Sequence, residues 1–191
     1  MSVDALYDAF FAHEAWTEDD YFALPETVAR VELADGVLVV SPIAGSPHQR
    51  LTRAVGFVIG AASPTRDWEV YDGLNVRLWQ GHIRIPDLVI ARRGINAVIF
   101  DATDVLLVGE VTSPGNFRYD RIVKHRDYAA AGIRFYLRVD LENGPEVLEA
   151  TLYELVDDEY QEAARSVDGL LRCQLPWPFE ADLRALAADG I

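Results

Sequence analysis

The stretch VLLVGEV, residues 105–111, decides the fold of this chain. A run of apolar residues broken only by Gly109 and Glu110 is typical of a central strand covered on both faces. A helix is expected next, over residues 118–131, with Gly132 as its stop signal. A strand over residues 135–140 follows. The order strand, helix, strand predicts a right-handed crossover and a parallel strand pair.

The segments around this unit predict antiparallel pairing. Residues 30–40 read as a hairpin, because Asp35-Gly36 is a turn signal between two apolar runs. Further strands are expected over residues 68–71, 75–79, 83–91, 147–155, 160–164 and 170–175, and a terminal helix over residues 178–188. Together these elements predict one mixed α/β (α+β) domain over residues 1–191. It would have a mixed central sheet flanked by helices and an antiparallel C-terminal extension.

Two further helices have recognisable start signals. Thr17 is expected to cap a short helix that Pro25 bounds. Ser46 is expected to cap a longer one, with Pro47 in its first position and Gln49 completing a capping box. His48 then lies in the first turn, where it borders the buried face.

Composition indicates an ordinary globular protein. The 191 residues are 50% hydrophobic, which is enough for one core, and Cys173 is the single cysteine, which fits a reducing compartment. Residues 1–16 have no basic segment followed by an apolar run, so no signal peptide is expected. No stretch has the roughly 18 apolar residues of a membrane span. We therefore expect a cytoplasmic protein with no membrane partner.

The net charge of −14 counts against nucleic-acid binding, because domains with that function usually carry a basic surface. The positive charges do gather, however, within one helical stretch that holds Arg118, Arg121, Lys124, His125 and Arg126. A carboxylate-rich site also becomes less negative when a divalent cation binds. The acidity makes a polymeric substrate less favoured without excluding it.

Three carboxylates lie in apolar surroundings. Asp87 follows Pro86 inside the apolar segment 83–90, Glu110 is the one charge in residues 105–111, and Glu32 lies between Val31 and Leu33. A buried carboxylate is costly unless it is paired or bound to a metal. The structural alternatives are a strand-end cap for Asp87, an ion pair for Glu110, and a solvent-facing strand position for Glu32.

Lys124 is the only lysine of the chain, against 16 arginines. Arginine replaces lysine readily on a solvated surface, but not where a compact ammonium must lie beside a water and a phosphate. We expect Lys124 to share a helix face with Asp120 and Tyr128, opposite a core stripe that includes Ile122. The structural alternative is a surface ion pair between Asp120 and Lys124.

Converging carboxylates are the oxygen ligands that Mg²⁺ and Mn²⁺ prefer. Two or three of these carboxylates, if they converge, would hold such a metal, and Lys124 would orient or help deprotonate the attacking water and offset negative charge. His48 would be a supplementary acid or base, or else a histidine at the border of the core. One cysteine and scattered histidines make no zinc site, and a glycine-rich phosphate loop is lacking.

An ordered series of short motifs resembles the Uma2 family, formerly a domain of unknown function. The resemblance runs from Trp16 to the terminal helix. Its motifs are Trp16-Thr17, Asp20-Tyr21, Glu32-Leu33, Asp35-Gly36, His48-Gln49, Pro86-Asp87, Glu110-Val111, Ser113-Pro114, Asp120, Lys124, Tyr128, Gly132, Tyr136 and Val139-Asp140. The family looks like a branch of the PD-(D/E)XK superfamily, which has the restriction-endonuclease-like fold.

The resemblance implies a metal-dependent endonuclease with Glu32, Asp87 and Glu110 as the acidic residues of its metal site. The usual pattern has a lysine two positions after Glu110, where this chain has Thr112. By resemblance, the branch has moved that lysine onto the following helix, where Lys124 stands.

Three functions remain open from the sequence. The first is a Mg²⁺- or Mn²⁺-dependent nuclease that acts on nucleic acid, with DNA favoured over RNA. The second is a catalytically silent scaffold that binds a protein or nucleic-acid partner, and the third is a hydrolase of small phosphodiesters, which fits the acidity better. A homodimer is expected by analogy with related folds, although the sequence locates no interface.

Overall fold

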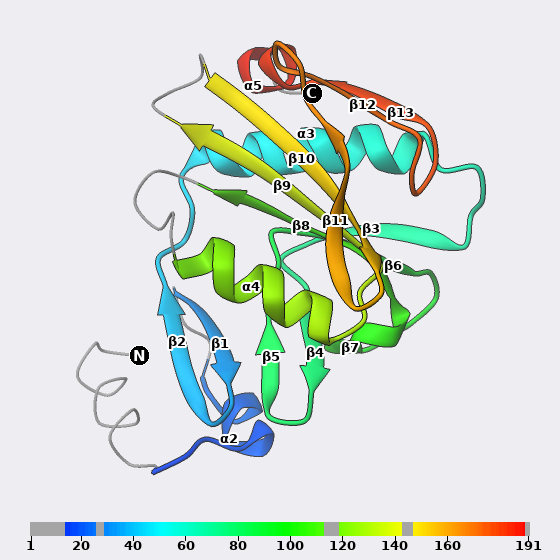
Figure 1. Ribbon diagram of the computed structural model, residues 1–191. Helices are drawn as coiled ribbons and strands as arrows, with labels where there is room; N and C mark the ends of the chain where they lie inside the picture. The colour runs from blue at the N-terminus through cyan, green and yellow to red at the C-terminus, as the bar shows by residue number, and fades with distance from the viewer. Residues whose placement is uncertain (1–13, 26–28, 113–118, 143–146, 190–191) are drawn as a thin grey trace.

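The computed structural model describes residues 14–25, 29–112, 119–142 and 147–189, and their strands form three sheets (Figure 1). The largest sheet consists of β3 (Trp68–Asp72), β6 (Leu88–Arg92), β8 (Val105–Thr112), β9 (Phe135–Glu142), β10 (Val147–Val156) and β11 (Glu159–Arg165). Its strand order is β11-β10-β9-β8-β6-β3.

The second sheet consists of β1 (Arg30–Ala34), β2 (Val37–Ser41), β4 (Asn75–Trp79), β5 (His82–Arg84) and β7 (Ile99–Asp101), in the order β2-β1-β5-β4-β7. A C-terminal pair is formed by β12 (Leu170–Cys173) and β13 (Phe179–Asp182). The mixed α+β class and the antiparallel C-terminal extension predicted from the sequence are therefore confirmed.

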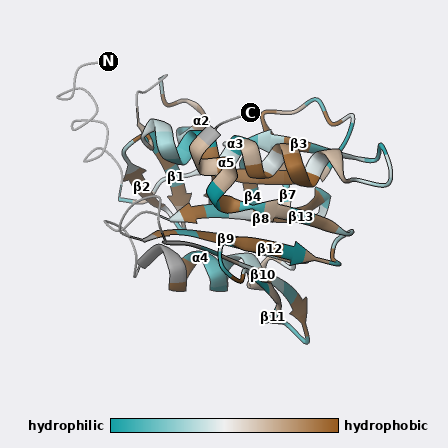
Figure 2. Cartoon of the chain, turned by 90° about the horizontal axis from the view of Figure 1, so that it is seen from above, coloured by the Kyte–Doolittle hydropathy of each residue, from teal (hydrophilic) through white to brown (hydrophobic). Residues whose placement is uncertain are grey.

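The helices are α2 (Glu18–Phe22), α3 (Ser46–Ala61), α4 (Tyr119–Ala130) and α5 (Leu183–Asp189), with a short 3₁₀ turn at Ala102–Asp104. Seen from above, the hydrophobic strands β8 and β9 lie between α3 and α4 (Figure 2). On the α3 side, Leu51, Val55 and Ile59 pack into a core with residues of the large sheet and the C-terminal pair. On the α4 side, Tyr128 belongs to a second core with residues of β8, β9 and β4.

The β8–α4–β9 unit confirms the prediction of a parallel pair. β8 and β9 are parallel, with Glu110 opposite Arg138 and Val108 opposite Tyr136. Gly132 has φ +74°, in the left-handed region that glycine adopts without strain, and α4 ends two residues before it. Since side chains alternate along a strand, Glu110 projects from β8 on the same face as Val108 and Thr112.

Two local predictions are also confirmed. β1 and β2 are an antiparallel hairpin, and both Asp35 (φ +51°) and Gly36 (φ +84°) adopt the positive φ of a type I′ turn. Thr17 caps α2 through a capping box with Asp20.

Three local features differ from the prediction. The segment 83–91 is not one strand: Pro86 has no backbone donor, and the chain passes there from β5 in one sheet to β6 in the other. The N-cap of α3 is Gly45, and Ser46 is already helical. Gln49 makes no capping box, because its side-chain amide donates to the carbonyl of Ala44.

The terminal helix is shorter than expected. Phe179 and Ala181 are buried while Glu180 and Asp182 are exposed, the alternation of a strand. The helix begins after Asp182, whose carboxylate accepts hydrogen bonds from the two backbone N–H groups of Arg184 and Ala185.

The orientation of α4 was also predicted wrongly. Ile122, expected in the core, is 70% exposed, whereas Lys124 and Tyr128 are buried. Ser113-Pro114, Arg118 and the side chains of Asp120 and Arg121 lie outside the described residues. In the part of the chain that is described, no helix has the length and apolarity needed to cross a membrane.

Candidate active site

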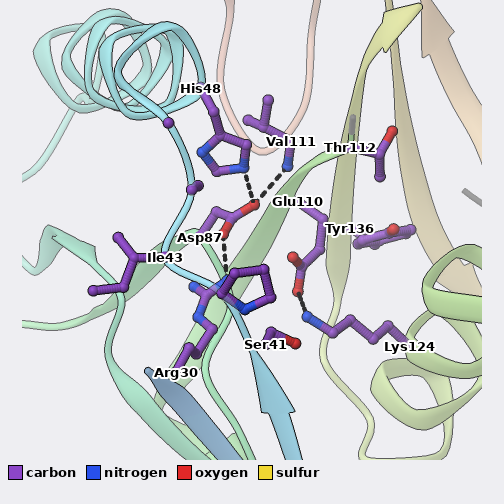
Figure 3. Close-up of a pocket in the computed structure, with 13 residues that line it drawn as sticks. Arg30, Ser41, Ile43, His48, Asp87, Glu110, Val111, Thr112, Lys124 and Tyr136 are labelled. Carbon is purple, nitrogen blue, oxygen red and sulfur yellow. Dashed lines mark hydrogen bonds and ion pairs between the residues drawn. The ribbon is translucent and has the colours of Figure 1, made fainter. Parts of the chain in front are cut away.

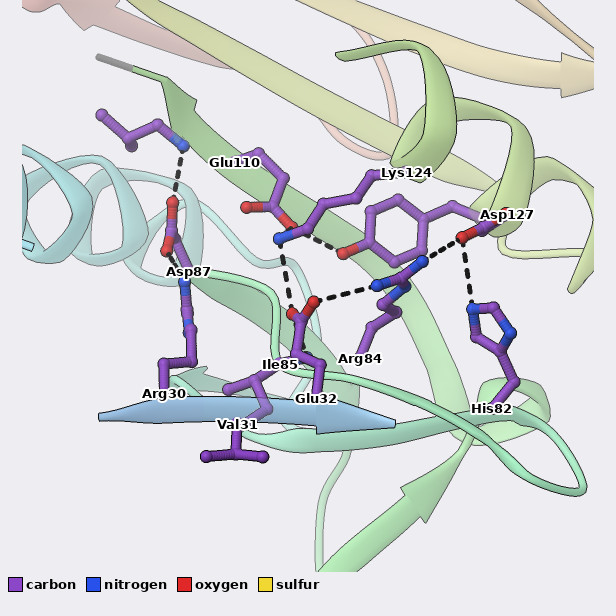
Figure 4. A network of polar contacts seen from close by, with 12 residues as sticks. Arg30, Val31, Glu32, His82, Arg84, Ile85, Asp87, Glu110, Lys124 and Asp127 are labelled. Carbon is purple, nitrogen blue, oxygen red and sulfur yellow. Dashed lines mark hydrogen bonds and ion pairs between the residues drawn. The ribbon is translucent and has the colours of Figure 1, made fainter. Parts of the chain in front are cut away.

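The five predicted site residues come from five segments that meet at the junction of the two larger sheets. Asp87 lies directly before β6, Glu110 is in β8, Lys124 in α4, Glu32 in β1, and His48 in the first turn of α3. All except Glu32 line one cavity of about 260 Å³ (Figure 3). Glu32 contacts Lys124 and is otherwise held by a buried network next to the cavity (Figure 4).

Asp87 is fixed by three donors. Its Oδ1 accepts from the Arg30 guanidinium at 2.6 Å, and its Oδ2 accepts from the backbone N–H of Val111 at 2.8 Å. The His48 Nε2 lies 3.0 Å from the same Oδ2. Burial alone would favour the neutral carboxyl, but His48 and Arg30 outweigh it and hold the pKa of Asp87 well below its usual range. Asp87 is therefore a carboxylate, as a metal ligand must be.

Glu110 is buried and accepts two hydrogen bonds at one oxygen. The Lys124 ammonium lies 3.0 Å from Oε1, and the Tyr128 hydroxyl donates to the same atom at 2.5 Å. Burial, together with the nearby charge of Asp87, outweighs the attraction of Lys124 and raises the pKa of Glu110 to about 7. Figure 3 shows the Glu110 carboxylate between Asp87 and Lys124, facing the cavity.

Lys124 reaches two carboxylates from α4. Its Nζ lies 3.0 Å from Glu110 Oε1 and 3.4 Å from Glu32 Oε1, and its side chain is 9% exposed. Burial disfavours the ammonium, but the two carboxylates outweigh this effect and the pKa of Lys124 is raised. The lysine is therefore charged at neutral pH and held at one point beside Glu110.

A buried ionic network positions Glu32 (Figure 4). The Arg84 guanidinium donates to Glu32 Oε2 at 3.1 Å and to Asp127 Oδ2 at 2.6 Å, and the backbone N–H of Ile85 donates to Glu32 Oε1 at 2.9 Å. Asp127 also lies 3.2 Å from His82 Nε2. Because Asp127 and Lys124 are both on α4, the network ties the lysine-bearing helix to β1 and β5.

Arg30, Arg84 and Asp127 were not among the residues predicted from the sequence. Arg84 interrupts the same apolar segment as Asp87, so the argument that selected the aspartate applied to it too. Arg30 is two residues before Glu32 on β1, and a strand places such a pair on one face. Asp127 follows Lys124 by three residues, which places both on one face of α4.

Thr112, at the position where the usual pattern has lysine, also lines the cavity. Its hydroxyl donates to Asp140 Oδ1 at 2.7 Å, across the parallel β8–β9 pair. The ammonium of Lys124 occupies the place beside Glu110 although its helix follows β8. The resemblance implied that the lysine has moved from the position of Thr112 to the helix that follows β8. The structure is compatible with this move, because Lys124 reaches Glu110 from α4.

The donor set at the cavity fits a hard divalent cation only in part. Asp87 and Glu110 offer carboxylate oxygens, the ligands of Mg²⁺ and Mn²⁺. Among the residues that the structure describes, however, no group of three or more Asp, Glu, His or Cys side chains is arranged to hold a metal. Mg²⁺ is commonly bound by one or two carboxylates together with substrate phosphates and water, and that mode fits the two carboxylates here.

Comparison with known protein families assigns the chain to one of them. The model of the Uma2 family, described as "Putative restriction endonuclease", matches residues 18–183, a range that contains all five site residues. The chain belongs to the Uma2 family. A search of the curated proteins found no match.

A solved structure has the same fold as this Uma2 chain. It is described as a "putative nuclease belonging to DUF820 from Anabaena variabilis ATCC 29413", and it is 17% identical with a TM-score of 0.70. The match covers 90% of the present chain and 99% of that one. At this identity the likeness supports the restriction-endonuclease-like fold and nothing finer.

Proposed function

We propose that this Uma2 protein is a Mg²⁺- or Mn²⁺-dependent endonuclease that hydrolyses phosphodiester bonds of nucleic acid, with DNA as the favoured substrate. The observation that carries the proposal is the meeting of Asp87, Glu110 and Lys124 at one cavity, from a loop, a strand and a helix. Two carboxylates and an ammonium on a cavity wall are the groups that metal-assisted phosphodiester hydrolysis requires.

In this proposal Asp87 and Glu110 hold the metal, and Glu32 supports the site by fixing Lys124. A bound metal would supply a hydroxide at neutral pH and neutralise charge on a phosphoryl oxygen. The Lys124 ammonium would offset the negative charge that develops on the phosphoryl group. Since Arg30 and His48 already fix Asp87, the carboxylate needs little reorganisation before the reaction.

His48 has a proposed supplementary role as an acid or base. Its Nε2 is engaged with Asp87, and its Nδ1 is buried without a hydrogen-bond partner in the described part of the chain. A ring nitrogen at the cavity wall, with its orientation fixed by a carboxylate, is suited to exchange a proton with a leaving group.

The second candidate is a silent scaffold, and a specific observation favours it. Each of the three carboxylates is paired with a cation of the protein itself: Asp87 with Arg30, Glu110 with Lys124, and Glu32 with Arg84. A variant that lacks Lys124 cannot distinguish the nuclease from the scaffold, because a buried ion-paired lysine stabilises the fold in both cases. Conservative replacements of the carboxylates can distinguish them.

The test is cleavage of supercoiled plasmid with Mg²⁺ or Mn²⁺ by the wild type, Asp87→Asn and Glu110→Gln. The proposal predicts metal-dependent nicking that falls at least about 100-fold in each variant while the far-ultraviolet spectrum stays native. Glu180→Gln, an exposed carboxylate on β13, is the control and should cleave as the wild type does. Undiminished cleavage by either site variant would refute the proposal.

Two further outcomes assign the other functions. Turnover of bis(p-nitrophenyl) phosphate without any cleavage of plasmid or single-stranded nucleic acid would indicate a hydrolase of small phosphodiesters. No turnover of any of these substrates, with metal present, would indicate the scaffold.

A further inference from the structure

A buried hydroxyl in the wall of the active-site cavity has no partner. Tyr136 is 1% exposed, lines the cavity together with Asp87, Glu110 and Lys124, and has its hydroxyl buried without a hydrogen-bond partner among the described residues (Figure 3). A buried polar group without a partner costs stability, typically about 1–3 kcal/mol. Such a group in a cavity wall is expected where a ligand completes its hydrogen bonding.

The ring of Tyr136 is held firmly in place. His125 and Tyr160 lie against it, with ring centroids 5.6 and 5.7 Å away, and Tyr153 is stacked on it at 5.8 Å. The ring of Tyr128 lies at 5.7 Å. Aromatic contacts at these distances are attractive, and four of them fix the ring. The hydroxyl is therefore presented to the cavity at a fixed point, as preorganised donors are.

The hydroxyl of Tyr136 is suited to donate rather than to accept. Burial, with the carboxylate of Glu110 nearby, raises the pKa of Tyr136 well above its usual value, so the group keeps its proton. The cavity also holds the guanidinium of Arg30 and the ammonium of Lys124. Asp87 and Glu110 balance these two cations, so the metal of the proposed function would make the cavity positive, and a neutral donor there favours a ligand that carries negatively charged acceptor oxygens.

We propose that Tyr136 is a substrate-binding residue of this site, whose hydroxyl donates a hydrogen bond to a non-bridging phosphate oxygen. The proposal rests on the proposed function, since it names the phosphate group as the occupant of the cavity. The cavity of about 260 Å³ has room for one phosphate group, and an adjoining cavity of about 250 Å³ shares Arg30, His48 and Asp87 with it. The rest of a polymeric substrate would extend from the bound phosphate along that second cavity.

The test is Tyr136→Phe, which removes the hydroxyl and keeps the ring. Inorganic phosphate is titrated by calorimetry into the wild type and the variant in a buffer that contains Mg²⁺, and both proteins are melted without phosphate. We expect the affinity for phosphate to fall roughly 10- to 100-fold, as for one lost hydrogen bond to a charged acceptor. The melting temperature should not fall, because the hydroxyl has no partner to lose.

Tyr160→Phe is the matched control. Its hydroxyl donates to the carbonyl of Ile133 at 2.7 Å, and its ring belongs to the same cluster without lining the cavity. This variant should melt at a lower temperature and bind phosphate as the wild type does. Tyr136→Phe is therefore predicted to weaken phosphate binding without a lower melting temperature, and Tyr160→Phe to lower the melting temperature without weaker phosphate binding.

Three results would overturn the assignment: equal phosphate affinity in Tyr136→Phe, a lowered melting temperature of that variant, or a wild type that does not bind phosphate. The outcome is distinguishable from that of the nuclease proposal. A wild type that cleaves DNA while Tyr136→Phe binds phosphate normally contradicts only the role of Tyr136. A wild type that binds phosphate through Tyr136 but cleaves nothing contradicts only the nuclease.

Discussion

Replacement of Arg84 by methionine is predicted to destabilise the protein strongly. Arg84 is 4% exposed and joins Glu32 on β1 to Asp127 on α4, two carboxylates that are each 3% exposed. Methionine fills a similar volume but leaves both carboxylates without the guanidinium. The change therefore tests whether the buried network, rather than apolar packing alone, holds α4 and its lysine against β1.

The expected loss follows from the partners that remain. Breaking a buried ion pair costs about 3–5 kcal/mol, because the surviving charge stays buried. Glu32 keeps Lys124 at 3.4 Å and the N–H of Ile85, and Asp127 keeps His82 at 3.2 Å. We therefore expect the lower end, about 3 kcal/mol. For a chain of this length, about 2–4 °C of melting temperature per kcal/mol gives a fall of about 6–12 °C.

The assay is thermal unfolding of Arg84→Met beside Arg172→Met. The guanidinium of Arg172 pairs with Glu180 at 3.2 Å, but both side chains are 64% exposed, and an exposed pair contributes only about 0–1 kcal/mol. Arg172→Met should therefore melt close to the wild type. A fall of less than about 2 °C in Arg84→Met, or equal falls in both variants, would show that the buried network does not hold α4 against β1.

Two further predictions concern packing and pH. Gly109→Ala should lower the free energy of unfolding by about 1–3 kcal/mol in urea titrations, because the new Cβ would lie 3.1 Å from the Cβ of Leu88; an unchanged value would contradict this. Burial and Arg138 lower the pKa of His125 below 6.5, so protonation favours the unfolded chain and stability should fall as the pH drops below about 6.5. His125→Phe keeps the aromatic contacts and should melt with a weaker dependence on pH between about 5.5 and 7.5, whereas an identical dependence would exclude His125 as its source.

Much of the fold could be predicted because local patterns specify it. The apolar residues 105–111, the stop signal at Gly132 and the Asp35-Gly36 turn each act through neighbouring residues, and each led to a correct element. The break between β5 and β6 was missed for a different reason. Pro86 has no backbone donor for a sheet, but the transfer of the chain to another sheet depends on which strands pair, and sequence neighbours do not encode that.

Site residues could be predicted where a charged residue interrupts an apolar segment or where a residue type is rare in the chain. Asp87 and Glu110 interrupt apolar segments, and Lys124 is the one lysine, so each was visible without a structure. Arg84 interrupts the same apolar segment as Asp87 and could have been selected with it, whereas Arg30 does not stand out among 16 arginines.

The buried face of α4 was mispredicted because apolarity alone places Ile122 inside. In the structure, Glu110 on β8 draws Lys124 and Tyr128 inward. A buried carboxylate on the preceding strand, 14 residues before Lys124, thus decides which face of the helix is covered, and the apolar pattern of the helix itself does not report that.

The proposal that Asp87 and Glu110 hold a divalent metal at the cavity beside Lys124 is tested most directly by calorimetric titration of Mn²⁺. The proteins are the wild type, Asp87→Asn, Glu110→Gln and the exposed control Glu180→Gln, each with and without inorganic phosphate. We expect the wild type and Glu180→Gln to bind Mn²⁺, more tightly with phosphate, and both site variants to lose this binding. A wild type that binds no Mn²⁺ in either titration, or site variants that bind it as the wild type does, would contradict a metal site at these two carboxylates.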